Sequence, residues 1–103
     1  MTAVFIANWQ VKEGQEADWA EVAKEFEPIG TRLGFQNQRF FTAYGNPAVN
    51  GNLITWAAEC ENLAALGAVL DNLTADAEIQ GWLAKASGSA TLVGSQIANE
   101  VVY

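Results

Sequence analysis

Hydrophobic and polar residues along the chain follow two repeat patterns, one typical of strands and one typical of helices. Residues 3–11, AVFIANWQV, alternate between two faces and are rich in β-branched and aromatic side chains, which predicts a strand. Residues 15–26 repeat their apolar positions at helical spacing, which predicts a helix that Gly34 ends. Pro28 cannot donate the hydrogen bond of a helix interior, so we expect a kink or a restart near Glu27.

The rest of the chain predicts two strands, two helical segments and a final strand that runs to the C-terminus: 35–44, 52–60, 62–73, 75–86 and 91–103. The turn-rich loop 45–51 is short, so the two strands that flank it form a hairpin. Asn62 and Thr74 are the expected N-caps of the two helical segments.

This order of elements, β-α-β-β-α-β, predicts an α+β, ferredoxin-like fold with a four-stranded antiparallel sheet and helices on one face. A chain of 103 residues fits one domain, residues 1–103, with a core of its own.

The second face of the sheet is expected to be apolar too. On the first strand, Phe5, Ala7, Trp9 and Val11 share one face, and Val4 and Ile6 head the other. Simple alternation also places Phe35 and Phe41 opposite Phe40 and Tyr44, and Val93 and Ile97 opposite Leu92 and Ala98. An apolar face without a helix needs another molecule, so we expect a homodimer packed sheet to sheet. Its candidate seam residues are Asn8, Gln10 and Tyr103.

Charge and composition exclude several classes of function. The net charge is −7, with 12 acidic and 5 basic residues, which disfavours nucleic acid and anionic membrane surfaces as partners. No apolar run approaches the roughly 18 residues of a membrane span, and the first ten residues lack the pattern of a secretion signal, so a cytoplasmic protein is expected. The chain has no histidine and a single cysteine, Cys60, which excludes Ser–His and thiol–imidazole mechanisms. We therefore expect neither a metal site nor a cofactor.

Three stretches, WQVKEGQEADW (9–19), ENLAALGAVLDNLTADAEIQGWLAKA (61–86) and TLVGSQI (91–97), resemble the dimeric α/β barrel superfamily. The resemblance is to its antibiotic-biosynthesis-monooxygenase-like and NIPSNAP-like groups and covers nearly the whole chain. It implies a dimeric ferredoxin-like fold with a ligand cavity between the helices and the sheet. The superfamily includes cofactor-independent quinone-forming monooxygenases, haem-degrading enzymes, isomerases, decarboxylases and ligand-binding domains, and a fold does not choose among them.

The haem-degrading branch uses an Asn on the first strand, a Trp and a His. Asn8 and Trp56 are present here, but the chain has no His. That branch also has its Asn seven residues before the glycine that opens the first helix, whereas Asn8 lies six before Gly14. A shift of one residue exchanges the faces of a strand, so Ala7 takes the place of the reactive Asn and Asn8 points away from the cavity. Haem degradation is therefore not expected.

Aromatic residues and one arginine are the candidate ligand-binding residues: Trp9, Trp19, Phe26, Arg39, Phe41, Tyr44, Trp56 and Trp82. Four tryptophans in a small domain indicate either ordinary core packing or the wall of an aromatic cavity. Arg39 either pairs with an acid, such as Glu59 on the neighbouring strand, or binds an anionic group of a ligand.

Three functions stay open at this point. The first is a small-molecule enzyme of the cofactor-independent monooxygenase type, with Asn8, Arg39, Tyr44 and Trp56 as candidates to assist. The second is a non-catalytic module that binds a hydrophobic acid or an aromatic compound. The third is a structural dimer without a ligand. The lack of a good general base weighs against the first, and the abundance of tryptophan weighs against the third.

Overall fold

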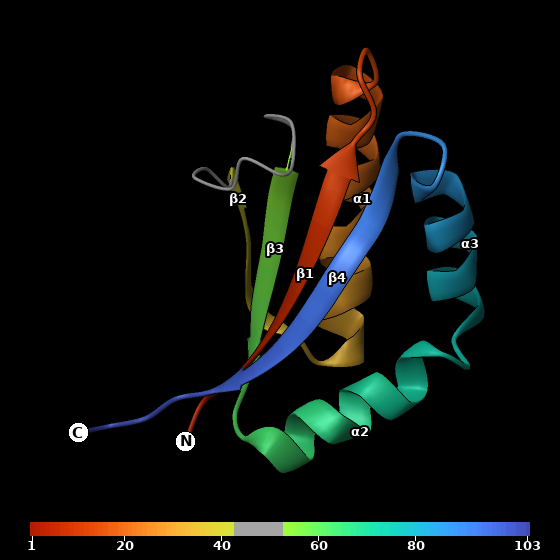
Figure 1. Ribbon diagram of the computed structural model, residues 1–103. Helices are drawn as coiled ribbons and strands as arrows, with labels where there is room; N and C mark the ends of the chain where they lie inside the picture. The colour runs from red at the N-terminus through yellow and green to blue at the C-terminus, as the bar shows by residue number, and fades with distance from the viewer. Residues whose placement is uncertain (43–52) are drawn as a thin grey trace.

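The computed structural model of the chain describes residues 1–42 and 53–103. Its elements follow the predicted order (Figure 1): β1 (Ala3–Val11), α1 (Glu16–Leu33), β2 (Gln36–Thr42), β3 (Leu53–Cys60), α2 (Leu63–Leu73), α3 (Ala77–Ala86) and β4 (Ala90–Asn99). The strands form one antiparallel sheet in the order β2-β3-β1-β4, which is the predicted ferredoxin-like arrangement. Tyr44 and the predicted loop 45–51 lie outside the described residues.

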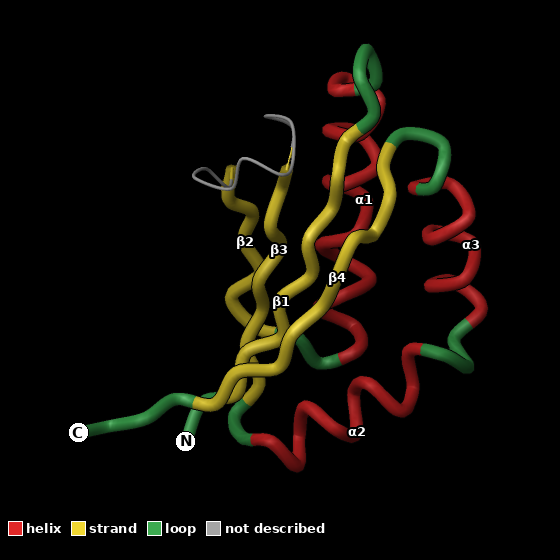
Figure 2. The backbone as a smooth tube through the Cα atoms, viewed as in Figure 1, coloured by secondary structure: helices red, strands yellow, loops and turns green. Residues whose placement is uncertain are grey.

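The three helices lie on one side of the sheet, which we call the helix face, and the opposite side is the open face (Figure 2). No helix in the described ranges is long and apolar enough to cross a membrane. Helix α1 runs through Pro28 as one element, so the expected restart near Glu27 does not occur. Gly34 ends it as predicted, in the left-handed conformation, with its N–H donating to the carbonyls of Gly30 and Thr31.

The two helices of the second half meet at a corner, where one predicted cap is wrong. Asn62 caps α2 as expected, and its side chain accepts a hydrogen bond from the N–H of Ala65. Thr74, however, keeps helical backbone angles at the end of α2. The N-cap of α3 is Asp76, whose extended backbone lets its carboxylate accept from the N–H of Ile79.

A β-bulge in β2 changes which side chains face the helices. Gln36 pairs with Glu59 and Arg39 pairs with Ala57, so β2 fits one extra residue into this interval. Asn37 absorbs the distortion with a φ of 51°. Phe35 and Phe40 therefore share the helix face and Phe41 lies on the open face, whereas simple alternation placed Phe35 with Phe41.

A second irregularity has the same effect in β4. Trp9 pairs with Leu92 and Asn8 pairs with Gly94, which leaves Val93 as the extra residue. Leu92 and Ile97 consequently both follow the register of the helix face, and the predicted opposition between them is wrong. The strand also ends earlier than expected, at Asn99, and residues 101–103 continue beyond the sheet as an exposed tail (Figure 1).

The core lies between the helix face and α1. It contains all four tryptophans, each no more than 7% exposed, with Phe26, Phe35 and the aliphatic residues of α1 and α2 around them. Ala3, Ala7, Trp9 and Val11 supply the β1 side of this core, as alternation predicts.

We predict that Gly34→Ala lowers the free energy of unfolding by about 1–2 kcal/mol, because Gly34 has a φ of 115° that side chains disfavour. The added methyl group would also lie 3.1 Å from Cγ2 of Val69. Gly67→Ala, on the exposed side of α2 with nothing within 4 Å, should instead raise stability by about 0.5–1 kcal/mol. Urea unfolding of both variants measures the difference, and equal effects would contradict the cap at Gly34.

Candidate functional site

A cavity of about 200 Å³ lies between the helix face of the sheet and the second-half helices. Its wall is almost entirely apolar, and among residues 1–42 and 53–103 only three polar residues line it, all of them neutral. The lining residues come from β1, β2, β3 and β4 below and from α1, α2 and α3 above: Phe5, Ala7, Trp9, Phe26, Phe35, Phe40, Trp56, Leu73, Thr74, Ile79, Gln80, Trp82, Leu83, Leu92 and Ser95.

The floor of the cavity follows one row of paired residues across the sheet. Phe40 pairs with Trp56, Trp56 with Ala7, and Ala7 with Ser95. Directly opposite residues of antiparallel strands point to the same side, so this row combines two large rings with two small side chains. The small side chains of Ala7 and Ser95 leave the space that α3 does not fill.

The inner wall is a continuous series of aromatic contacts. Trp9 meets Trp82 edge-on at 5.6 Å between ring centroids, and Trp82 meets Phe26 at 4.7 Å. Phe26 then contacts Trp56 at 5.3 Å, and Trp56 contacts Phe35 at 5.0 Å. Edge-to-face contacts at these distances are favourable and fix the rings in place, so the wall is rigid.

The mouth of the cavity lies between the α2–α3 corner and the edge strand β4. Thr74 and Gln80 on one side, and Leu92 and Ser95 on the other, line the cavity and are also exposed to solvent, as is Phe40 on the opposite edge strand β2. The three polar lining residues of the described part of the chain are therefore exposed, and the buried lining residues that the structure describes are apolar or aromatic.

Four of the eight predicted ligand-binding residues come together in the cavity wall: Trp9, Phe26, Trp56 and Trp82. Trp19 does not reach the cavity, because it packs behind Trp9 at 5.2 Å between ring centroids. Arg39 and Phe41 lie on the open face and Tyr44 lies outside the described residues. The bulge in β2 explains the error for Phe41, since its neighbour Phe40 takes the place in the cavity.

Arg39 forms the cross-strand ion pair that the sequence offered as its structural role. Its guanidinium lies 2.8 Å from a carboxylate oxygen of Glu59, and the amide of Asn37 donates to the same oxygen. The hydrogen bond from Arg39 is the main cause of the lowered pKa of Glu59. The guanidinium also lies over the ring of Phe41, 5.7 Å from its centroid.

The open face carries the residues predicted for a dimer seam. Asn8 lies there, as the count from Gly14 predicts, and its side-chain oxygen accepts a hydrogen bond of 2.7 Å from the hydroxyl of Thr55. Gln10 follows on the same face, half-buried, and Tyr103 ends the exposed tail beyond β4. Ala7, not Asn8, faces the cavity, in agreement with the same count.

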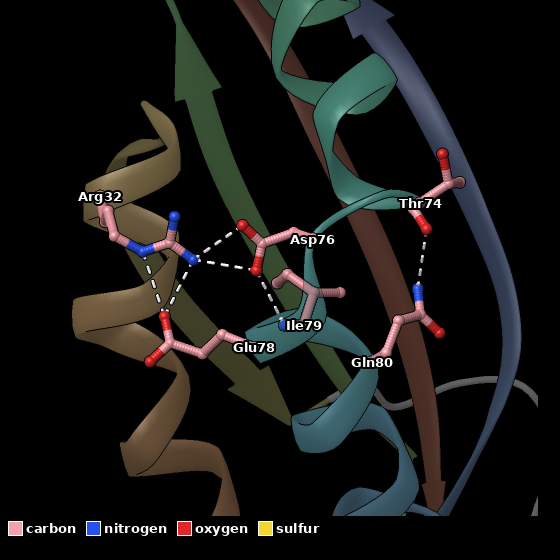
Figure 3. Close-up of polar contacts among 6 residues, drawn as sticks. All are labelled: Arg32, Thr74, Asp76, Glu78, Ile79 and Gln80. Carbon is pink, nitrogen blue, oxygen red and sulfur yellow. Dashed lines mark hydrogen bonds and ion pairs between the residues drawn. The ribbon is translucent and has the colours of Figure 1, made fainter.

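Ion pairs outside the cavity hold α3 against α1. Nη2 of Arg32, near the end of α1, lies 3.0 Å from both carboxylate oxygens of Asp76, and its Nε lies 3.1 Å from Glu78 (Figure 3). These hydrogen bonds raise the pKa of Arg32, and the N–H of Ile79 is the main cause of the lowered pKa of Asp76. At the other end of α3, Lys85 pairs with Glu25 at 2.8 Å.

Several lining residues were missed because they depend on tertiary register. Phe40 faces the cavity only through the bulge in β2, and Leu92 and Ser95 share one face only through the bulge in β4, which alternation does not reveal. Gln80 enters the wall because α3 begins directly after Asp76. The one local signal was Asn37, since Asn tolerates a positive φ better than most residues.

The groups that could do chemistry in this site are few. The indole N–H of Trp82 is occupied by the carbonyl of Val22, 2.8 Å away. The indole N–H of Trp56 is buried and has no hydrogen-bond partner in the described part of the chain. Burial raises the pKa of the Cys60 thiol, which disfavours a reactive thiolate. Within residues 1–42 and 53–103, no three Cys, Asp or Glu side chains gather to hold a metal ion.

Comparison with known proteins gives matches in structure alone. No protein-family model matches the sequence, and neither does any curated protein. A mutant form of SnoaB, a cofactor-independent oxygenase from Streptomyces nogalater, superposes with a TM-score of 0.72 at 13% identity, over 99% of this chain and 95% of that one. A putative antibiotic biosynthesis monooxygenase from Bordetella bronchiseptica gives 0.71 at 16% identity, over 98% of both chains.

A third similar structure is an uncharacterized NIPSNAP domain protein from Burkholderia xenovorans, with a TM-score of 0.65 at 13% identity, over 98% of this chain and 94% of that one. Identities this low establish the fold alone. The chain thus has the fold that antibiotic-biosynthesis-monooxygenase-like and NIPSNAP domain proteins share, as the sequence resemblance implied.

Proposed function

We propose that this protein binds a small, flat aromatic compound in the cavity and acts on it as a cofactor-independent monooxygenase-like enzyme. The observation that carries the proposal is the cavity itself: a rigid aromatic wall with polar groups only at the mouth. Binding sites for small molecules have this composition. The shared fold with a cofactor-independent oxygenase adds the reaction class.

The reaction would need little from the protein beyond binding. A methylene group between aromatic rings loses a proton, and the resulting carbanion passes electrons to O₂. One oxygen atom becomes the new carbonyl of the substrate and the other leaves as water, so the substrate supplies all four electrons. An apolar cavity supports such a step by reducing the access of water to the reacting centre, while its exposed mouth leaves water to accept the proton.

A second candidate function is a non-catalytic binding module, and the lining residues favour it in one respect. No acid or base lines the cavity within the described residues, and 43–52 contain no Asp, Glu, Lys or Arg. A ligand could therefore bind without meeting a proton acceptor of suitable pKa.

Oxygen uptake with anthrone separates the two functions. We predict that the protein accelerates uptake and that Trp56→Phe, in the cavity wall, slows it about tenfold or more through loss of substrate positioning. Trp19→Phe is the matched control, because Trp19 is equally buried but does not line the cavity. Saturable quenching of tryptophan fluorescence by anthrone without uptake would assign the binding module. A flat response in both measurements would refute both functions.

The open face supports a further part of the proposal, that a second copy of the chain covers the sheet. Val4 and Ile6 lie on this face beside Ala57, and Phe41 there is 48% exposed. The face is mixed and not uniformly apolar as expected, since Asn8, Gln10, Arg39 and Glu59 also lie on it, and none of the described helices covers it. Two such faces packed together would bury it in both copies.

We predict that Ile6→Glu raises the dissociation constant of the dimer at least about 100-fold, because it would bury an unpaired charge in the interface. Leu63→Glu is the control, since Leu63 is 49% exposed on α2, away from the open face. Sedimentation equilibrium measures both variants. A wild-type chain that stays monomeric at tens of micromolar, or equal effects of the two variants, would refute the sheet-to-sheet dimer.

The two faces of β1 should also have different functions, one in dimerisation and the other in ligand binding. Asn8→Ala is expected to weaken dimerisation about threefold to tenfold and leave anthrone binding unchanged, because Asn8 lies on the open face. Trp9→Ala is expected to do the reverse, since its ring lies in the cavity wall. Sedimentation and fluorescence titration of both variants test the pair, and the opposite pattern would mean that the faces are exchanged.

A further inference from the structure

Gln80 is the polar side chain at the mouth whose orientation the structure fixes. Its Nε2 donates to the backbone carbonyl of Thr74 at 3.3 Å (Figure 3). A carbonyl oxygen can only accept, so the nitrogen of the amide must face Thr74 and Oε1 must face away from it. Gln80 lines the cavity and its Oε1 accepts no hydrogen bond from the described residues, so it is an acceptor that a ligand could use.

The position of Gln80 depends on contacts outside the cavity. Gln80 lies in the first turn of α3, which begins at Ala77 directly after the N-cap Asp76. The carboxylate of Asp76 caps this turn through the N–H of Ile79 and is held at the same time by Arg32 (Figure 3). Arg32 thus joins the end of α1 to the turn that carries Gln80, without touching the cavity.

The cavity disfavours charged ligands. Its lining contains no charged side chain, and residues 43–52 could add none, since they contain no Asp, Glu, Lys or Arg and the chain has no His. An anion that entered would lose its hydration without gaining a counter-charge, which is costly. The net charge of −7 opposes it further.

A neutral hydroxyl group, unlike an anion, can bind in this cavity without a counter-charge. It can donate to Oε1 of Gln80, and the hydroxyl of Ser95 across the mouth makes no side-chain hydrogen bond within the described residues. The aromatic interior then receives the ring of the same ligand. A molecule with a flat apolar body and a hydroxyl at one end satisfies both parts of the site.

We propose that Gln80 is the specificity-determining residue of the cavity, accepting a hydrogen bond from the un-ionised hydroxyl of an aromatic ligand, and that Arg32 is its positioning residue. This inference rests on the proposed function only in that the cavity must bind small aromatic molecules. It selects the neutral hydroxyaromatic compound over the hydrophobic acid, which the sequence alone left open.

Calorimetric titration with three probes that share one ring system tests the proposal: naphthalene, 2-naphthol and 2-naphthoate at pH 7. We expect 2-naphthol to bind about 3- to 10-fold more tightly than naphthalene, as one net hydrogen bond allows, and 2-naphthoate to bind more weakly than naphthalene. Gln80→Met, which keeps length but removes the acceptor, should reduce 2-naphthol to the affinity of naphthalene and leave naphthalene unchanged. Gln15→Met is the matched control, since Gln15 makes no side-chain cap hydrogen bond and does not line the cavity.

The role of Arg32 is tested by the ratio of the two affinities. Arg32→Gln should lower the preference for 2-naphthol over naphthalene to about twofold or less, with naphthalene affinity unchanged, and Arg32→Lys should restore part of it. A merely structural role would weaken both probes equally, and that result would remove Arg32 from the proposal.

The outcomes distinguish ligand binding by the cavity from the specific role of Gln80. If no probe binds, the cavity is not a binding site and the proposed function fails with the inference. If naphthalene binds but 2-naphthol gains nothing, or if Gln80→Met keeps the preference, the role of Gln80 is overturned while the cavity remains the binding site. Tighter binding of 2-naphthoate would overturn the neutral-ligand selection.

Discussion

The packing of large rings against a sheet with small residues at its centre is the constraint on which the rest of the structure depends. Trp9, Trp82, Phe26 and Trp56 contact one another edge to face, and such contacts hold rings at set distances. Ala7 lies beneath them on the central strand β1. The edge-to-face contacts keep these rings apart, and the small side chain of Ala7 cannot fill the space between them. The core of this small chain therefore contains a cavity in place of solid packing.

Polar contacts keep that space open from the outside. Helix α3 is joined to α1 through the indole N–H of Trp82, whose ring lines the cavity, and through the ion pairs of Arg32 and Lys85, which do not line it. Each exposed ion pair adds little stability. Because the ion pairs lie at both ends of α3, however, they fix the position of this helix relative to α1. Charge is thereby confined to the outer surface, and the wall that a ligand meets is neutral.

Periodicity predicted the elements and the β1 faces because these depend on local sequence. Trp9 and Asn8 were assigned to the correct sides, since β1 pairs with β3 without interruption and alternation holds along it. The same reasoning failed for Phe41 and Leu92, where one extra residue in the strand reverses the faces. A bulge is set by pairing with a distant strand, so only a weak local sign such as Asn37 could have indicated it.

The absence of an acid or base among the described residues of the lining limits the kind of chemistry that this cavity could perform. An enzyme without a proton acceptor depends on a substrate whose own C–H bond is acidic enough to ionise in contact with water. The polar residues at the mouth lie where water is still available, and the aromatic interior is where a neutral, apolar molecule such as O₂ is best accommodated. A proton lost at the mouth can therefore pass to water while the apolar interior holds O₂, and an apolar wall suits both demands. The lack of an acid or base among the described lining residues argues against a catalytic residue but not against catalysis. The substrate can supply the reactive C–H bond, and the cavity can supply an apolar environment for it.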